Sequence, residues 1–405
     1  MTGCFVFQNI LNFLKFKGEA AHVSQVTEIW YSMKLSEQTY QALSSALRDL
    51  SEMAGSDQLN QKSNGLFVID ESHLKELKRV WKTWLHLPVF KSDWLSEQRK
   101  QAFESSPGSE YGIYSYYITL PSEHVKSAKK WMKDGVFACT KAPMVAENPT
   151  LTGCPKILDS FPYSLCFDPS ILPFSSWDYV EVKKFGHCNS IVQMYRAYIN
   201  DVLQRSKRNL DGGHISFKAV LADCMMINKH LPPKVKYDRV LTSNLSDYIP
   251  LPHIQQLWSE KLNHSNPHAT IVTETQNWLR QFYPEAGVEA LNPATIATMA
   301  TWVVKDTGSS VLLTDMGFMT YREYHDNSNQ FMEYLRASFY AFAPKSTPLP
   351  SAKELGKEFQ LKLRNFRRNE NRIASFRMAL NCRRACTVVG HERVLEWTPL
   401  KTARK

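Results

Sequence analysis

The chain has 405 residues, long enough for two domains, and its 43% hydrophobic and 12% aromatic residues can form sizeable cores, which excludes an intrinsically disordered protein. The net charge of +10 is unevenly distributed, because residues 362–405 contain twelve Lys and Arg against three Glu, a net of +9. The basic character therefore belongs to the C-terminal tail and not to the chain as a whole.

Three further features limit the class of protein. Apolar runs such as MATWVV around Trp302 are far too short to span a bilayer. The N-terminal stretch MTGCFVFQNILNFLKFK has no basic residue before its apolar part, so we expect a core helix there and not a signal peptide. The eight cysteines are scattered without a Cys-x-x-Cys pair, so no zinc finger or other metal site is predicted. These features predict a cytoplasmic chain without a membrane partner.

Residues 1–105 are predicted to form a helical region. A helical pattern runs from His22 to Ala54, and Ser36 is expected to cap a restart within it. After the polar break GSDQLNQKSNG, a second helix is predicted with Ser72 as its N-cap. Its buried side is predicted to contain Leu74, Leu77, Val80, Trp81, Trp84 and Leu85.

Residues 106–190 are rich in Pro, Ser, Gly and Tyr and are predicted to form an irregular, loop-rich segment packed on the core. Within this segment, a helix is expected after Ser122 and through Trp131. Residues 191–345 are predicted to form an α/β core, which begins with a helix from Ile191 to Leu203.

Residues 214–275 of this core alternate between strands and a helix. Strands are predicted in ISFKAVLAD, in YDRVLTSNL and in ATIVTET. The helix between the last two has one apolar face, formed by Ile254, Leu257, Trp258 and Leu262. Strands that alternate with helices are typical of a parallel sheet with crossover helices, so the three strands are predicted to be parallel neighbours. In such sheets, ligands bind outside the carboxyl ends of the strands, where the sequence places Asp223, Ser243, Asn244 and Glu274.

Residues 346–405 form a basic C-terminal segment, which follows a predicted helix in FMEYLRASFYAF. The second half of the segment is predicted to be a hairpin that closes an edge of the sheet. In SFRMALN, the side chains of Phe376, Met378 and Leu380 alternate with others, as in a half-buried strand. The tail is therefore predicted to pack back on the core.

The stretch KYDRVLTSNLSDYIPL, followed by a helix and HATIVTET, resembles the fourth and fifth strands of a class I methyltransferase fold. More narrowly, it resembles a domain family of unknown function that also occurs in an axonemal dynein assembly factor and in fungal proteins with a MYND finger. Other similar pieces are WYSMKLSEQTY, LKRVWKTWL and LRNFRRNENRIASFRMALNCRR, so the resemblance covers patches of residues 30–397. Its most specific motif is TSNL at residues 242–245.

The resemblance implies an S-adenosylmethionine site, in which Asp223 would accept from the adenine amino group and Asn244 would position a target nitrogen. The sequence departs from this pattern, because no G-x-G-x-G turn follows a strand and Leu245-Ser246-Asp247 replaces the expected Pro-Pro-aromatic run. We therefore favour the alternative roles, in which Asp223 caps a turn and Asn244 bonds its own backbone.

Two other groups of residues are candidates for binding. His264 and His268 lie in one turn on the far side of the sheet from the ligand edge, and surface histidines are the favoured interpretation. The tail could bind phosphates, with Phe366 and Phe376 stacking on the bases of a single-stranded nucleic acid. The favoured alternative is a strand in which Phe376, Met378 and Leu380 point inward and Arg377 points outward. The arginines of this predicted basic patch are Arg364, Arg367, Arg368, Arg372, Arg377, Arg383 and Arg384.

The sequence thus predicts an α/β chain with a degenerate class I methyltransferase-like core, a helical N-terminal region and basic C-terminal strands. The predicted function is that of a non-catalytic scaffold, similar to an assembly factor, with a protein as its partner and no cofactor. The two alternatives are a methyltransferase that uses S-adenosylmethionine and a tail that binds nucleic acid or an acidic partner. The oligomeric state is left open.

Overall fold

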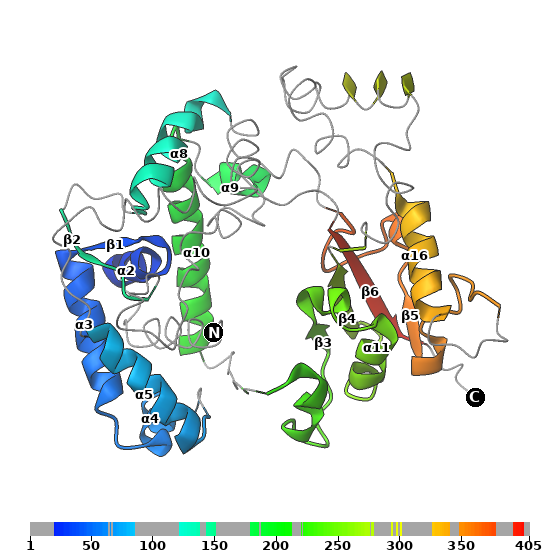
Figure 1. The fold of residues 1–405 in the computed structure, drawn as a ribbon, viewed down its shortest axis with the longest axis horizontal. Coiled ribbons are helices and arrows are strands. Elements are labelled where there is room, and N and C mark those ends of the chain that lie inside the picture. The colour runs from blue at the N-terminus through cyan, green and yellow to red at the C-terminus, as the bar shows by residue number, and fades with distance from the viewer. Residues whose placement is uncertain are drawn as a thin grey trace. The chain divides into compact units, whose positions relative to one another are not determined.

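A computed structural model places the chain in two compact units, one of residues 1–221 with 384–387 and one of residues 222–383 with 388–405 (Figure 1). Each unit is described by itself. The residues that the structure describes are 20–63, 65, 68–85, 121–137, 143–150, 179–185, 188–212, 220, 222–275, 277–278, 293–294, 297–298, 300–301, 326–340, 348–377 and 392–400.

The first part of unit 1 is a helical layer. Helices α3 and α5 contact each other along their length and bury Leu43, Leu47, Leu74 and Trp81 between them and their neighbours. The buried side predicted for the helix after Ser72 is confirmed in α5, because all of the residues predicted for that side are buried except Leu85, which is half-buried. The elements are α2 (Ala20–Tyr31), β1 (Lys34–Ser36), α3 (Glu37–Ser51), α4 (Ser56–Lys62) and α5 (Glu71–Leu85).

The starts of two helices differ from the prediction in detail. Helix α5 begins one residue before the predicted cap, and its N-terminal amide at His73 donates to Asp70 Oδ1 at 2.9 Å. Ser72 instead donates to the same carboxylate oxygen, so the predicted cap was wrong by two residues. Ser36 does stand at the N-cap of α3, but its hydroxyl contacts Glu28 and Thr39 and caps no backbone amide.

The rest of unit 1 packs around its longest described helix, α10. The helix predicted after Ser122 is confirmed as α8, and the helix predicted from Ile191 is confirmed and continues to Asp211. Strand β2 pairs antiparallel with β1, and Asn148 next to it donates to the carbonyls of Ile29 and Ser32. The elements are α8 (Ser122–Asp134), β2 (Met144–Glu147), α9 (Tyr179–Phe185) and α10 (Ile191–Asp211).

Unit 2 is built on a four-stranded mixed sheet with the order β3-β4-β6-β5. Strands β3 and β4 are parallel, with Val240 opposite Ile271, whereas β6 is antiparallel to both of its neighbours. Strand β5 therefore runs in the same direction as β4. The elements are η2 (Cys224–Lys229), β3 (Arg239–Leu241), η3 (Ser243–Asp247), α11 (Leu251–Ser259), β4 (Thr270–Thr275), α16 (Ser328–Tyr340), η5 (Lys357–Phe359), β5 (Leu361–Leu363), η6 (Phe366–Arg368) and β6 (Arg393–Pro399).

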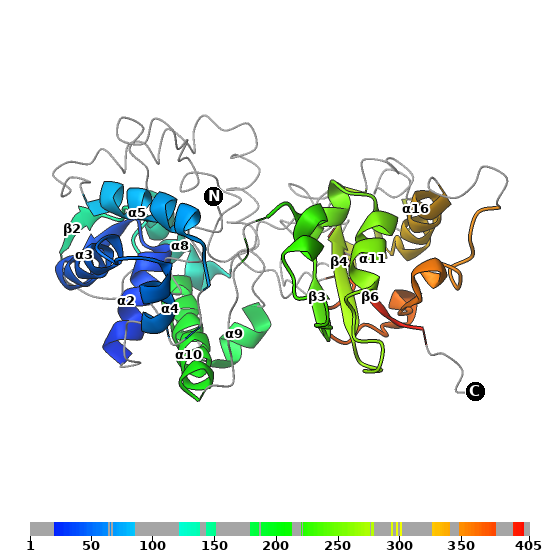
Figure 2. The same cartoon turned by 90° about the horizontal axis from the view of Figure 1, so that it is seen from below.

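The two faces of this sheet have different surroundings. The strand register places Val240, Ile271, Trp397 and Leu361 on one face, where they join a core with residues of α11 and α16. Figures 1 and 2 show these two helices beside the sheet. Strand alternation places Leu241, Val272, Glu396 and Lys362 on the opposite face. This second face is partly apolar and partly charged.

The predictions for the sheet are confirmed in part. YDRVLTSNL and ATIVTET contain the parallel neighbours β3 and β4, and the helix between them is α11, which is shorter than the predicted face because Leu262 lies beyond it. In ISFKAVLAD, the structure describes only Val220, Ala222 and Asp223, none of them in a strand, so most of that prediction lies outside the described residues.

The prediction that the tail packs on the core is confirmed for the parts described. Strands β5 and β6 complete the sheet, and Phe376 is buried in the core. However, Ser375–Arg377 form a bend and not the start of a strand, while Met378 and Leu380 lie outside the described residues. Within the described part of the chain, no helix combines the length and apolar character needed to cross a bilayer.

Candidate functional site

The carboxyl ends of β3 and β4 are joined by short hydrogen bonds. Ser246 Oγ, in the turn after β3, donates to the carbonyl oxygen of Glu274 at 2.5 Å. Asp247 Oδ1 accepts from Thr275 Oγ1 at 2.5 Å and from the backbone amide of Asn277 at 2.9 Å. These hydrogen bonds join the turn after β3 to the carboxyl end of β4, so the polar groups of this edge bind one another.

Ser243 stands at the start of the turn after β3 with an unusual backbone. Its φ of +50° lies in the left-handed region, which costs a non-glycine residue about 1–3 kcal/mol. The Ser243 hydroxyl lies 3.5 Å from Asn244 Oδ1. The backbone amide of Thr242, the residue before it, donates to Val272 O at 3.0 Å. The structure therefore brings Ser243 and Asn244 to the same edge as Glu274, as predicted from the strand ends.

A cavity of about 300 Å³ opens at this edge, on the face of the sheet that carries α16. Burial raises the pKa of the Tyr334 phenol, and the nearby Asp247 carboxylate raises it further, so the phenol stays neutral and able to donate. The lining does not include Asp223, Ser243, Asn244 or Glu274. The lining residues are Ser246, Asp247, Tyr248, Ile249, Pro250, Leu251, Thr273, Thr275, Tyr334, Leu335, Ser338 and Leu395.

Asp223 has the structural role that the sequence favoured. It is exposed and caps the 3₁₀ helix η2, because its Oδ1 accepts from the amide of Met225 at 2.8 Å. That helix contacts α11 through Asn228, which donates to Leu257 O at 3.2 Å. The role of Asp223 is therefore that of an N-cap in its own turn.

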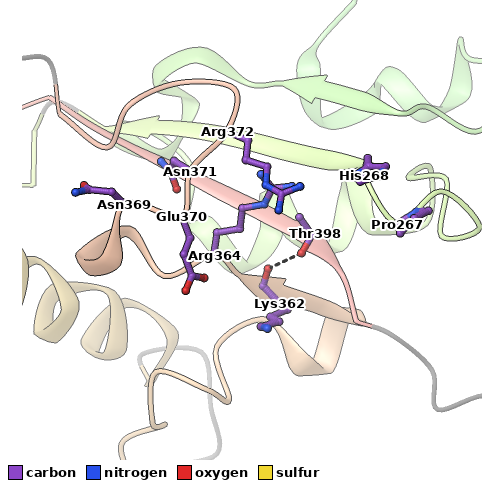
Figure 3. A pocket seen from close by; sticks show the side chains of 9 residues that line it. All are labelled: Pro267, His268, Lys362, Arg364, Asn369, Glu370, Asn371, Arg372 and Thr398. Atoms are coloured by element: carbon purple, nitrogen blue, oxygen red, sulfur yellow. Dashed lines mark hydrogen bonds between the residues drawn. The ribbon is translucent and has the colours of Figure 1, made fainter.

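A second hollow, of about 450 Å³, lies at the opposite end of β4, beside the turn that precedes this strand (Figure 3). Its cationic side chains are Lys362, Arg364 and Arg372, and Glu370 is the carboxylate among its lining residues. In the view of Figure 3, the Arg364 and Arg372 side chains are directed toward the same part of the hollow. The other lining residues are Pro267, His268, Asn369, Asn371 and Thr398.

Glu396, a fully buried carboxylate on β6, fixes one wall of this basic hollow. It accepts from Arg364 Nη1 at 2.8 Å and from the backbone amides of Arg372, Ile373 and Ala374 at 2.6–3.0 Å. The carboxylate thus satisfies four donors, as a buried charge requires. Arg364 and the backbone that carries Arg372 are held in place by the same group.

The predicted basic patch is therefore divided. Of its described arginines, only Arg364 and Arg372 line the hollow, together with Lys362, which was not among the predicted residues. Arg367 donates to Asn329 on α16, and Arg368 is exposed elsewhere. Arg377 is half-buried and does not line the hollow, while Arg383 and Arg384 lie outside the described residues.

The aromatic side chains of the tail point inward. Phe366 and Phe376 are 2% and 6% exposed and stack on each other with ring centroids 4.2 Å apart. They cannot also stack on bases, so the proposed single-strand binding mode, in which these rings interleave with the arginines, was wrong. The inward orientation predicted for Phe376 is confirmed, although not as part of a strand, while Met378 and Leu380 lie outside the described residues.

Two buried charges in β6 were missed by sequence reasoning. One is Glu396, and the other is Arg393, which donates to Asn327 Oδ1 at 2.7 Å and lies over the rings of Trp278 and Phe376 at 5.7 and 5.5 Å. The available signal was the charged pair within the otherwise apolar RVLEW, because charges inside a core strand need partners.

His264 and His268 lie in the turn before β4, on the far side from the carboxyl edge, as predicted. Both are exposed, and His268 lines the basic hollow. Across the described ranges, no cluster of three or more His, Cys, Asp or Glu side chains is arranged to hold a metal ion. Comparisons of the chain with known protein families, with curated proteins and with solved structures find no match.

Proposed function

We propose that the chain is a non-catalytic scaffold that binds protein, built on a degenerate methyltransferase-like α/β sheet. The sheet is compatible with this choice of fold, because β3 and β4, which contain the two stretches that carry the resemblance, are parallel neighbours. Strand β6 is antiparallel and lies between β4 and β5.

One observation carries the proposal that the scaffold is non-catalytic. The polar groups at the carboxyl edge, where such sheets bind their ligands, are bonded within the edge itself: Ser246 to Glu274 O, and Asp247 to Thr275 and Asn277. A catalytic edge would instead direct such groups toward a reacting atom. The bonds suit an edge that has a structural role.

The residues that the resemblance assigned to S-adenosylmethionine do not fit that cofactor. Asp223 caps its own turn, and neither of the two hollows described above is lined by Asp223 or Asn244. No step of a methyl transfer is therefore assigned to these side chains.

Exposed apolar side chains beside the same edge support protein binding. Leu241 on β3 and Tyr248 after η3 are 70% and 73% exposed, the two highest values among the exposed large hydrophobic residues of the described part of the chain. Aromatic residues on a surface are frequent anchors of protein interfaces. We expect a partner protein to cover these two side chains.

The test has two arms. In the first, calorimetry with S-adenosylmethionine at up to 1 mM is expected to show no binding. A micromolar constant that Asn244→Ala weakens at least tenfold, about 1.4 kcal/mol, would favour the enzyme alternative. In the second, photo-crosslinkers placed at Leu241 and Tyr248 are expected to form defined adducts in cell extract, and Leu349, 38% exposed in the same unit, serves as the control position. Equal adduct formation at all three positions would refute protein binding at this edge.

A further inference from the structure

We propose that the basic hollow formed by Lys362, Arg364 and Arg372 binds a phosphate group carried by a partner protein. This inference rests on the proposed protein-binding function and adds the chemistry that the partner must carry. The hollow is separate from the carboxyl edge, because it lies at the amino end of β4 beside Pro267 and His268 (Figure 3).

One arginine of the hollow, Arg364, has its guanidinium fixed in advance of any ligand, whereas Arg372 is fixed only through its backbone. Arg364 is only 12% exposed, and it uses Nη1 for Glu396, which leaves the other donors of its guanidinium without a partner among the described residues. Arg372 is held through its backbone by the same carboxylate, while its guanidinium has no partner among those residues. A fixed guanidinium such as that of Arg364 loses little entropy on binding, and the planar guanidinium of either arginine matches the geometry of phosphate oxygens.

The hollow has a net positive charge, which suits a small anionic group. Lys362 and Arg372 are exposed cations at its rim, and neither has a side-chain partner in the described part of the chain. Glu396 offsets the charge of Arg364, and Glu370 is a carboxylate of the lining, so the excess of positive charge is modest. A phosphate carries close to two negative charges at pH 7 and three acceptor oxygens, which these donors can satisfy together.

The lining favours a phosphorylated peptide over a nucleic acid. Among the residues that the structure describes, neither phenylalanine, tyrosine nor tryptophan lines the hollow, and the tail rings Phe366 and Phe376 are buried against each other. Among these lining residues, a nucleic acid strand would therefore have only the His268 ring to stack on. The Asn369 amide and the Glu370 carboxylate can instead bond to peptide groups beside the phosphate.

The experiment measures binding of the full chain to an arrayed peptide library with phosphoserine fixed at the centre, and to the same library with serine. The phosphoserine array is expected to give at least fivefold more signal, which 50 mM inorganic phosphate reduces more than 50 mM chloride. The double variant Lys362→Ala/Arg372→Ala should lose at least four fifths of that signal. Both substitutions are at exposed side chains, which protects the fold. Arg368→Ala, an exposed arginine of the same segment outside the hollow, should bind as the wild type does.

Three results would overturn the inference. Equal signals from the two libraries would show that phosphate is not recognised, and equal losses in the double variant and Arg368→Ala would show charge attraction without a site. Binding of a 12-nucleotide RNA that depends on Arg372, without binding to either library, would assign the hollow to nucleic acid. None of these results changes the crosslinking at Leu241 and Tyr248, so a failure here can be told apart from a failure of the proposed function.

Discussion

Replacement of Glu396 is the most informative perturbation of unit 2. The carboxylate is fully buried and accepts from Arg364 and from three consecutive backbone amides, those of Arg372, Ile373 and Ala374. Removal of one member of a buried ion pair typically costs about 3–5 kcal/mol, because the remaining charge is left without a partner. Glu396→Ala should lower the free energy of unfolding of unit 2 by that amount. Glu396→Gln should lower it by about 2–3 kcal/mol, because the isosteric amide still accepts some of the bonds.

The effect should be both global and local. Chemical denaturation with hydrogen exchange detected by mass spectrometry resolves the two units, which a single spectroscopic midpoint would not. Peptides covering residues 371–377 should exchange at least tenfold faster in Glu396→Gln, since three of their amides lose a charged acceptor. Glu370→Gln, a change at an exposed glutamate of the same segment, is the matched control and should shift neither quantity. If Glu396→Gln retains both the stability of unit 2 and the slow exchange of residues 371–377, the role given to this carboxylate is wrong.

Three further outcomes are expected. Gly135→Ala should destabilise unit 1 by about 1–2 kcal/mol in denaturant unfolding, because φ is +63° at this position and the new Cβ would lie 2.5 Å from Met33 Sδ. An unchanged free energy of unfolding of unit 1 would refute this backbone and steric strain. The pKa of the Asp70 carboxyl is lowered to about 2, mainly by the backbone amide of His73. Its stabilisation of α5 should therefore be complete above pH 4 and disappear as the pH falls toward 2. The melting temperature of Asp70→Asn should lack this part of the pH dependence. Truncation after Leu361 should unfold unit 2, because β6 lies between β4 and β5; unchanged hydrogen exchange in β4 of the truncated chain would contradict this.

The sequence was sufficient for the elements whose burial follows a local period. The inner side of α5, the helices α8, α10 and α16, and the strand in ATIVTET were all predicted from the sequence. The reason is that a helix or strand with one apolar face must bury it whatever its partner. The packing of the tail followed from the same logic, although the structure places β6 inside the sheet and not at its edge.

The assignment of polar residues required the tertiary structure. Arg364, Arg367 and Arg368 look equivalent in the sequence, yet only the first contacts a buried carboxylate, and that carboxylate lies 32 residues further along the chain. Asp223 and Asp247 are both acidic residues near predicted strand ends, yet one caps its own turn and the other joins two strands.

What the sequence by itself determined was the position of the helices and strands that have a clear apolar period, the buried side of α5 and the place where the positive charge is concentrated, whereas β1, α4, β2 and α9 were not predicted. The tertiary structure alone decided the sheet order, the four donors from which the buried Glu396 carboxylate accepts, and the separation of the carboxyl edge from the basic hollow. The physical reason is that apolar burial depends on periodicity along the chain, whereas a charge or hydrogen bond is satisfied by a specific partner that the fold brings from a distant position.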